Sequence, residues 1–291
     1  MLTIGLVLTA TAVIAVRSQR EAAEAAQALL TQYGSLDHRL KRGDEYFFNL
    51  DMPERAELEY QEAVDMEPSD ALNHDRLAQS LAAQGRYEEA LDEHINAVTL
   101  DGETALYHGN YAVTLFRMER FTDAERELRT CLELEPDNAQ YHNNLGVTLD
   151  NLERYEEALP EKRRAVELAP DNAECHWNLG VTLDYLEQYE EALPEKRRAA
   201  ELEPNYAEYH YGLAWTLDYL EQYEEALPEV RRAVELEPNY AEYHYGLALT
   251  LLNLGRMDEG IKELEAAAKL DPSYEADYQT FMSVLLEVLR A

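Results

Sequence analysis

The chain has 291 residues and carries 59 Asp and Glu against 25 Lys and Arg, a formal net charge of −34 at neutral pH. Such a surface repels nucleic acid, because phosphate binding depends on positive charge and counterion release, so a nucleic-acid partner is excluded. A basic protein partner would be attracted, although solvation of Glu-rich helix faces explains the acidity equally well. Two cysteines, Cys131 and Cys175, indicate neither a disulfide nor a compartment.

Residues 2–16 form an apolar stretch without charge, followed by Arg17 and Arg20. As a helix this stretch would cover roughly 24 Å, slightly less than the hydrocarbon core of a bilayer. Three interpretations are open: a single-pass membrane anchor over residues 1–17, a cleaved signal peptide, or a buried helix. A signal peptide normally begins with basic residues, which this segment lacks, although residues 10–12 resemble a cleavage site. We favour the membrane anchor.

The two arginines also set the predicted orientation of this anchor. The positive-inside rule keeps basic residues, and the chain that follows them, on the cytoplasmic side of a membrane. We therefore expect the rest of the chain on the cytoplasmic face rather than in the periplasm. Residues 18–36 are predicted to continue as a helix that links the anchor to the remainder of the chain.

A fixed period of 34 residues governs the chain after this segment. Proline recurs at this interval, and glycine takes its place at Gly34 and Gly102. A constant period in this range is typical of proteins built from stacked copies of one supersecondary unit. Such proteins present an extended surface, so the period favours binding over chemistry. The prolines are Pro68, Pro136, Pro170, Pro204, Pro238 and Pro272.

Each period is predicted to contain two helices. Its apolar residues follow helical spacings and lack the alternation of a strand, and the proline ends the second helix. N-caps are predicted at Asp171, Asn205 and Asn239, each followed three residues later by Glu. Small residues at fixed places allow the two helices to pass close together. These small residues include Gly146, Ala158, Ala165, Gly180, Ala192 and Ala199.

The residues of one period resemble the tetratricopeptide repeat. Residues 144–170 read N-L-G-V-T-L-D, then Y-E-E-A-L, then A-V-E-L-x-P, and the match recurs about seven times over residues 37–274. The resemblance implies an all-α, right-handed superhelical solenoid of about seven helix pairs, with the first helices on a concave face. It also implies a protein-interaction module. Residues 275–291 are predicted to be a capping helix, although their apolar side chains also suit a docking surface.

The layout of the chain resembles bacterial membrane-anchored tetratricopeptide proteins, because an apolar start and two arginines precede the repeats. One group of these proteins regulates lipopolysaccharide assembly and ends in a four-cysteine metal knuckle. This chain has no C-x-x-C motif. The membrane-anchored type is therefore predicted without that specific function.

The resemblance places one stripe of side chains on the concave face. Its aromatic residues lie beside carboxylates, which suits a peptide carrying Lys or Arg through stacking, cation–π contact and ion pairs. Packing of the aromatic residues between repeats is an equally open interpretation. A basic clamp for an acidic peptide is rejected, since only Arg76 and Arg117 are basic on these helices. The predicted partner-binding groove consists of Asn143, Asp150, Trp177, Val181, Asp184, Tyr185, Tyr211, Trp215, Asp218, Tyr219 and Tyr245.

A histidine also recurs once per period, from His74 to His244. Equivalent atoms of stacked repeats are expected to lie too far apart to share one Zn²⁺ ion, so no metal site is predicted. We predict that the rings pack as semi-buried aromatic residues do in the family. A pH response through imidazole titration remains open.

Basic runs in the second helices, Lys162–Arg164 and Lys196–Arg198, alternate with glutamates. Glu161, for example, has the spacing of an intrahelical ion pair with Arg164. These runs are predicted to form a solvated convex face.

No motif indicates catalysis or a cofactor, because the phosphate-loop, zinc-protease, nucleophile-elbow and dinucleotide-binding patterns are all missing from the sequence. We therefore predict a non-enzymatic, membrane-tethered scaffold or assembly factor. In its acidic, aromatic groove it would hold a segment of a partner protein from a membrane complex. This segment would be basic or complementary to the aromatic residues. The alternative is a permanent structural subunit of a membrane complex, or a self-associating homo-oligomer that uses its ends and convex face.

Overall fold

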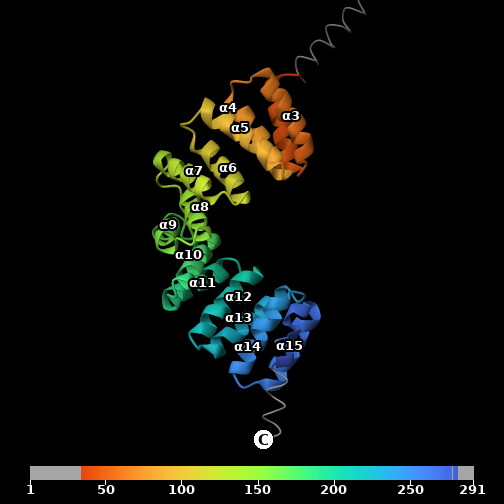
Figure 1. The fold of residues 1–291 in the computed structure, drawn as a ribbon, viewed down its shortest axis with the longest axis vertical. Coiled ribbons are helices and arrows are strands. Elements are labelled where there is room, and N and C mark those ends of the chain that lie inside the picture. The colour runs from red at the N-terminus through yellow and green to blue at the C-terminus, as the bar shows by residue number, and fades with distance from the viewer. Residues whose placement is uncertain (1–33, 277, 281–291) are drawn as a thin grey trace, which may run out of the picture. The chain divides into compact units, whose positions relative to one another are not determined.

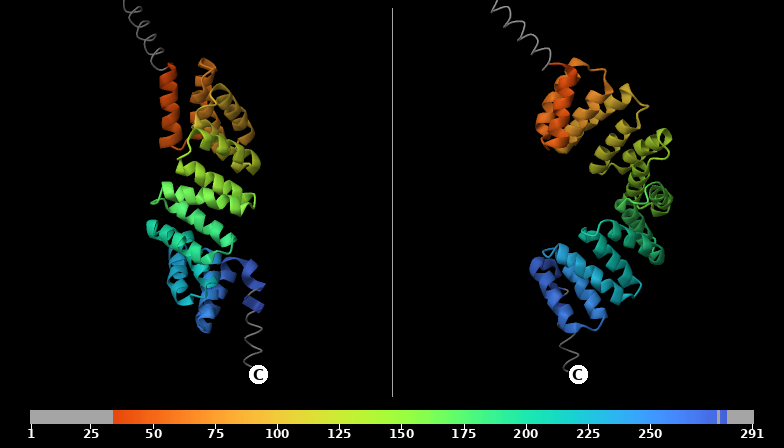
Figure 2. Two further views of the ribbon diagram at one scale, coloured as in Figure 1. Left: turned by 90° about the vertical axis from the view of Figure 1, so that its left-hand side faces the viewer. Right: turned by 180° about the vertical axis from the view of Figure 1, so that it is seen from behind.

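The computed structural model describes residues 34–276 and 278–280, and every regular element within them is a helix (Figure 1). The chain divides into two compact units, Met1–Leu134 and Glu135–Ala291. Within each unit, consecutive helices lie side by side, as the two views of Figure 2 show. The prediction of an all-α chain built from helix pairs is confirmed.

In the described part of the first unit, helix α2 runs directly into a π-helical turn. One further helix and then two helix pairs follow this turn. Each connection is a short turn, so neighbouring helices in the sequence are also neighbours in space. The elements are α2 (Leu36–Asp44), η1 (Glu45–Asn49), α3 (Pro53–Met66), α4 (Ala71–Ala83), α5 (Tyr87–Leu100), α6 (Ala105–Arg117) and α7 (Phe121–Leu134).

The second unit repeats one pattern, a first helix of 13 residues and a second helix of 14 residues. Each second helix contacts its own first helix, and α9, α11 and α13 also contact the first helix of the following pair. The elements are α8 (Ala139–Asn151), α9 (Tyr155–Leu168), α10 (Ala173–Tyr185), α11 (Tyr189–Leu202), α12 (Ala207–Tyr219), α13 (Tyr223–Leu236), α14 (Ala241–Asn253), α15 (Met257–Leu270) and a 3-10 turn, η2 (Pro272–Tyr274).

Small residues hold the helices of a pair together in the second unit. Ala158 and Ala165 of α9, and Ala192 and Ala199 of α11, are fully buried, because a larger side chain would separate the two backbones. Leucines of the first helices fill the space between neighbouring helices. These buried leucines are Leu145, Leu149, Leu179, Leu183, Leu213, Leu217, Leu247 and Leu251.

The turn inside each pair contains one residue in the left-handed backbone region. Gly255 occupies this place after α14 with φ of 74°. Backbone hydrogen bonds close the helix end at these turns; after α8, the Arg154 N–H donates to the Leu149 carbonyl at 3.0 Å, as in a Schellman motif. In the three preceding turns the left-handed residue is a glutamate, which costs about 1 kcal/mol relative to glycine. These residues are Glu153, Glu187 and Glu221.

The N-caps of the first helices α10, α12 and α14 lie one residue later than predicted. The cap of α10 is Asn172, whose side chain accepts a hydrogen bond from the Cys175 N–H at 3.1 Å. The predicted cap, Asp171, is exposed and instead forms an ion pair with Arg198 at 2.8 Å. The predicted caps Asn205 and Asn239 are likewise displaced by Tyr206 and Tyr240, which cap without a side-chain hydrogen bond.

The predicted localisation, a single-pass membrane protein with cytoplasmic repeats, is not supported and is corrected. Among residues 34–276 and 278–280, no helix is long and apolar enough to cross a bilayer. The helices of a pair have 13 or 14 residues, whereas a transmembrane helix needs about 20 apolar residues. The predicted anchor (2–16), nearly all of the linking helix (18–36) and most of the capping helix (275–291) lie outside the described residues.

Candidate functional site

A cavity in the second unit lies against the first helices α10, α12 and α14. Its volume is about 640 Å³, and we call it the aromatic cavity. Trp177, Tyr211 and Trp215 supply its large rings. The other lining residues from the predicted groove are Val181, Asp184 and Tyr185, and acidic residues of the neighbouring loops and helix starts complete it: Glu208, Glu237 and Glu242.

A second cavity of about 260 Å³ lies one repeat further along the same helices. Asp218 is its carboxylate, and we call it the Asp218 cavity. Tyr211 and Trp215 line both cavities, so the two are adjacent. Tyr219, Val230, Tyr245, Gly246 and Leu249 also line this cavity.

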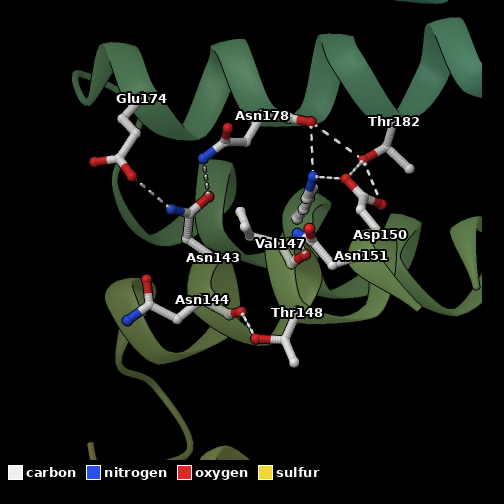
Figure 3. Close-up of polar contacts among 10 residues, drawn as sticks. Asn143, Asn144, Val147, Thr148, Asp150, Asn151, Glu174, Asn178 and Thr182 are labelled. Carbon is white, nitrogen blue, oxygen red and sulfur yellow. Dashed lines mark hydrogen bonds and ion pairs between the residues drawn. The ribbon is translucent and has the colours of Figure 1, made fainter. Parts of the chain in front are cut away.

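Most of the residues predicted for the groove therefore line one of these two cavities, but two do not. Asn143 is buried between α8 and α10, where it accepts a hydrogen bond from Asn178 at 3.0 Å and donates to Glu174 at 3.3 Å (Figure 3). Asp150 is held in the ion pair described below. Both residues join neighbouring helices and lie away from the two cavities.

The aromatic residues are packed and accessible at the same time. Tyr219 stacks on Tyr189 of the preceding second helix with ring centroids 4.8 Å apart, and Trp215 lies 4.2 Å from Tyr219. Tyr185 stacks in the same way on Tyr155 at 4.7 Å. Tyr185, Tyr219 and Trp215 nevertheless keep 59%, 55% and 37% of their surface exposed. Part of each ring thus packs within the repeats, while the remainder is exposed to solvent.

Two of the predicted groove carboxylates are engaged by buried lysines. The Lys162 ammonium contacts the Asp150 carboxylate and donates to the Asn178 carbonyl at 3.0 Å. Asp150 also accepts a hydrogen bond from the Thr182 hydroxyl at 2.9 Å (Figure 3). Lys162 is only 1% exposed, and burial lowers its pKa, while Asp150 opposes that shift.

The next repeat builds the same ion pair between Lys196 and Asp184. The Lys196 ammonium donates to the Gly212 carbonyl at 3.2 Å. It also lies 5.2 Å and 5.5 Å from the ring centroids of Trp177 and Trp215, within the range of cation–π attraction. Burial lowers the pKa of Lys196 and raises that of Asp184. The carboxylate of Asp184 therefore faces an internal cation at the wall of the aromatic cavity.

The prediction that Lys162 and Lys196 belong to a solvated face is wrong. Each lysine stem passes over a glycine of the first helix: a Cβ at Gly146 would lie 2.4 Å from the Lys162 Cγ, and one at Gly180 would lie 2.7 Å from the Lys196 Cγ. The missing side chain admits the lysine into the repeat. The sequence signal was available as a glycine followed sixteen residues later by a lysine.

The neighbouring arginines are solvated as predicted, but their partners differ from the predicted ones. Arg164 pairs with Asp137 at 2.7 Å and with Glu167 at 2.9 Å, not with Glu161. Glu161 instead accepts from the His142 ring at 2.6 Å. The carboxylate thus connects the two helices of a pair rather than two turns of one helix.

Asp218 differs from the two carboxylates before it because no lysine faces it. The lysine position is occupied by Val230 and the facing glycine position by Ala214, both buried. One carboxylate oxygen accepts from the Thr250 hydroxyl at 2.7 Å, and the other is buried without a hydrogen-bond partner. Burial raises the pKa of Asp218 to about 6, and the Thr250 hydrogen bond reduces that shift only partly.

The periodic histidines link the two helices of a pair and the preceding turn. In His210, one ring nitrogen lies 2.7 Å from Glu229 and the other 3.1 Å from the Pro204 carbonyl. The hydrogen bond to Glu229 raises the pKa of His210. Besides the packing predicted for these rings, each ring thus makes two polar contacts. The equivalent contacts recur at His74, His108, His142, His176 and His244.

The chain matches two sequence models of one family. One, described as Tetratricopeptide repeat, matches residues 40–103, 110–173 and 211–275, which is more than half of the chain; the other, with the same description, matches residues 173–206. The chain belongs to the tetratricopeptide repeat family. The tetratricopeptide fold is that of a protein-interaction scaffold. These matches do not show the membrane-anchored type that the N-terminal layout predicted.

Several solved tetratricopeptide structures are similar to this chain. YrrB, described as a tetratricopeptide protein with an unusual peptide-binding site, is 24% identical, covers 68% of this chain and 97% of its own length, and has a TM-score of 0.54. PilF of Pseudomonas aeruginosa is 20% identical over 72% of this chain and 94% of its own, with a TM-score of 0.64. MamA of Desulfovibrio magneticus RS-1 is 23% identical over 58% and 96%, with a TM-score of 0.55.

At these identities the similarity shows the shared fold alone. No curated protein matches the chain closely enough to be called a relative.

Proposed function

We propose that the protein is a scaffold that binds a peptide segment of another protein in the aromatic cavity of its second unit. The observation that carries this proposal is the chemistry of the cavity lining. Trp177, Tyr211 and Trp215 provide apolar area and stacking faces, and acidic residues surround them. Among the residues that line this cavity, the only Lys or Arg is Lys196, which is already paired with Asp184. The lining therefore favours a segment with aromatic and basic side chains.

Two adjacent cavities suit the side chains of a short extended segment. The aromatic cavity is adjacent to the Asp218 cavity, and Tyr211 and Trp215 line both. Side chains of alternate residues of a peptide could therefore occupy neighbouring cavities. YrrB is described as having a peptide-binding site, which is consistent with this use of the fold.

The test is a screen of the full chain against a random peptide library, followed by affinity measurement for an enriched peptide by fluorescence polarisation. We expect enriched peptides to combine an aromatic residue with Lys or Arg. Trp215→Ala should weaken binding at least about tenfold, because buried aromatic anchors dominate such interfaces. Phe48→Ala, which removes an exposed ring of the first unit, is the control and should leave affinity unchanged. The proposal would be contradicted if no peptide were enriched, or if Trp215→Ala bound an enriched peptide as tightly as the unmodified protein does.

A structural or self-associating role is the second candidate. It is favoured by apolar side chains that are exposed at η1 and on α3 of the first unit, namely Phe48, Leu50 and Leu58. Light scattering coupled to size-exclusion chromatography at micromolar concentration should show a stable homo-oligomer if these side chains mediate self-association. Phe48→Ala should then shift the protein towards the monomer. A monomer in the unmodified protein would contradict this candidate.

A further inference from the structure

The buried ion pair changes along the second unit in a stepwise manner. The first two repeats carry Asp150 with Lys162 and Asp184 with Lys196. In the third repeat only the cation is lost, because Val230 takes the place of lysine while Asp218 remains. In the fourth repeat the pair is replaced by two apolar residues, Leu252 and Leu264.

The third repeat therefore keeps a half-buried carboxylate, whose Oδ1 is buried without a hydrogen-bond partner, and lacks the lysine that would face it. Removing one member of a buried ion pair leaves an uncompensated charge, whereas replacing both by apolar residues is often neutral. The fourth repeat shows that the apolar solution is compatible with this fold. The third repeat keeps Asp218, and no Lys or Arg is among the described residues that line the Asp218 cavity.

The oxygen atoms that would receive this cation are still in place. In the second repeat the Lys196 ammonium lies between the carboxylate of Asp184 and the Gly212 carbonyl. The equivalent atoms of the third repeat are the carboxylate of Asp218, with its unpartnered Oδ1, and the Gly246 carbonyl. The Thr250 hydroxyl orients this carboxylate at 2.7 Å, just as the Thr216 hydroxyl contacts Asp184 at 3.2 Å.

The cavity also leaves room for the stem of a long side chain. In the first two repeats the lysine stem fills the space over Gly146 or Gly180. Val230 is shorter than lysine, and a cavity of about 260 Å³ remains beside Asp218. Trp215, Tyr219 and Leu249 line this cavity and are exposed. A side chain can therefore enter from the face that carries the aromatic cavity.

We propose that the Asp218 cavity is a socket for a lysine side chain of the bound partner, whose ammonium takes the position that Lys162 and Lys196 fill internally in the two preceding repeats. This inference rests on the proposed peptide-binding function and specifies one residue of the peptide. Lysine fits better than arginine because the internal occupants are compact ammonium groups. A planar guanidinium needs a wider, bidentate set of acceptors, and one oxygen of Asp218 is already occupied by Thr250.

The test uses the full chain and two small probes, Nα-acetyl-lysine N-methylamide and its Nε-acetylated form, in an NMR titration that follows the Thr250 and Gly246 amides. We expect saturable binding of the lysine probe and at least tenfold weaker binding of the uncharged form. Asp218→Asn should weaken binding of the lysine probe at least tenfold. Asp171→Asn removes an exposed carboxylate of the same unit and is the matched control, with unchanged affinity.

A second variant tests occupancy of the socket directly. Ala214→Gly with Val230→Lys restores the glycine and lysine of the two preceding repeats, so the internal lysine should displace the probe and weaken its binding at least tenfold. If this variant does not fold, the comparison of Asp218→Asn with Asp171→Asn remains decisive. The lysine socket would be contradicted if Asp218→Asn and Asp171→Asn changed the affinity for the lysine probe equally. It would also be contradicted if both probes bound equally well to the unmodified protein.

The outcome is separable from that of the proposed function. If the affinity of an enriched peptide falls in Trp215→Ala but does not change when every lysine of the peptide is acetylated, the lysine socket is contradicted. Peptide binding in the aromatic cavity would still be supported. Probe binding that depends on Asp218, without any enriched peptide, would contradict peptide binding while supporting the ammonium site.

Discussion

At the scale of single residues, Asp218 is the carboxylate whose environment differs most from that of its equivalents. Asp150 and Asp184 face lysine ammonium groups, whereas Asp218 faces Val230 and a single hydroxyl. Burial disfavours the charged form of a carboxyl group, so the pKa of Asp218 rises to about 6. The folded protein therefore binds a proton at this site more tightly than the unfolded chain does.

This shift determines how Asp218→Asn should change stability with pH. Because the folded pKa is raised, the carboxylate lowers stability as pH increases from about 4 to about 6, and the loss persists above that range. Asparagine stays neutral and keeps an acceptor for Thr250. We expect Asp218→Asn to raise the free energy of unfolding by about 1–3 kcal/mol at pH 7 and by close to nothing at pH 4.

Urea unfolding of the variant and the unmodified protein across this pH range is the measurement. Asp171→Asn, at an exposed position, should show no such pH-dependent gain. A constant difference between Asp218→Asn and the unmodified protein from pH 4 to pH 7 would show that Asp218 is ionised without penalty.

At the scale of helices, the buried ion pairs join three elements rather than two. Asp184 lies on α10 and Lys196 on α11, and the Gly212 carbonyl and the Thr216 hydroxyl that contact them both belong to α12. The pair therefore fixes one helix pair against the next in the second unit. The histidines act within a pair, since His210 of α12 contacts Glu229 of α13.

Asp184→Asn should be strongly destabilising because it leaves the Lys196 ammonium buried without a counterion. We expect a loss of about 3–5 kcal/mol in the free energy of unfolding, the usual effect of breaking a buried pair from one side. Removing both charges, in Asp184→Asn with Lys196→Met, should recover most of this loss. Chemical denaturation at pH 7 measures both variants.

The control for this prediction is Asp171→Asn, which breaks an exposed ion pair with Arg198 and should change stability by less than about 1 kcal/mol. An equally small effect of Asp184→Asn would mean that Lys196 reaches water and that the pair does not hold the helices together.

At the scale of the whole molecule, the net charge of −34 acts on association more than on the fold. It opposes the approach of a second copy and attracts basic segments, and both effects weaken with added salt. Peptide affinity should therefore fall with ionic strength, while the apolar side chains at η1 and α3 would bring copies together more readily at high salt. The ion pairs inside the repeats are shielded from salt by burial.

Much of this molecule follows from its 34-residue period. Contacts in a repeat protein are local, so the residues that form a helix pair lie within one period or the next. The alanines at 158, 165, 192 and 199 thus predicted the close helix pairs. The aromatic residues at 177, 211 and 215 line the aromatic cavity, and their role in binding a partner stays a prediction. The exact N-caps were not predicted correctly. Asp171, for example, does not cap α10, because its carboxylate forms an ion pair with Arg198.

The sequence by itself determined that the chain folds as helix pairs, because these depend on local spacing. Only the tertiary structure decided that Lys162 and Lys196 are buried and that Asp218 is left without a cation. That outcome depends on which side chains face each other across neighbouring helices. Gly146 and Gly180 leave room for the lysine stems, whereas the equivalent positions of the next repeat are occupied by Ala214 and Val230. Burial sets the electrostatic energy of these groups, and burial is a property of the packed repeats.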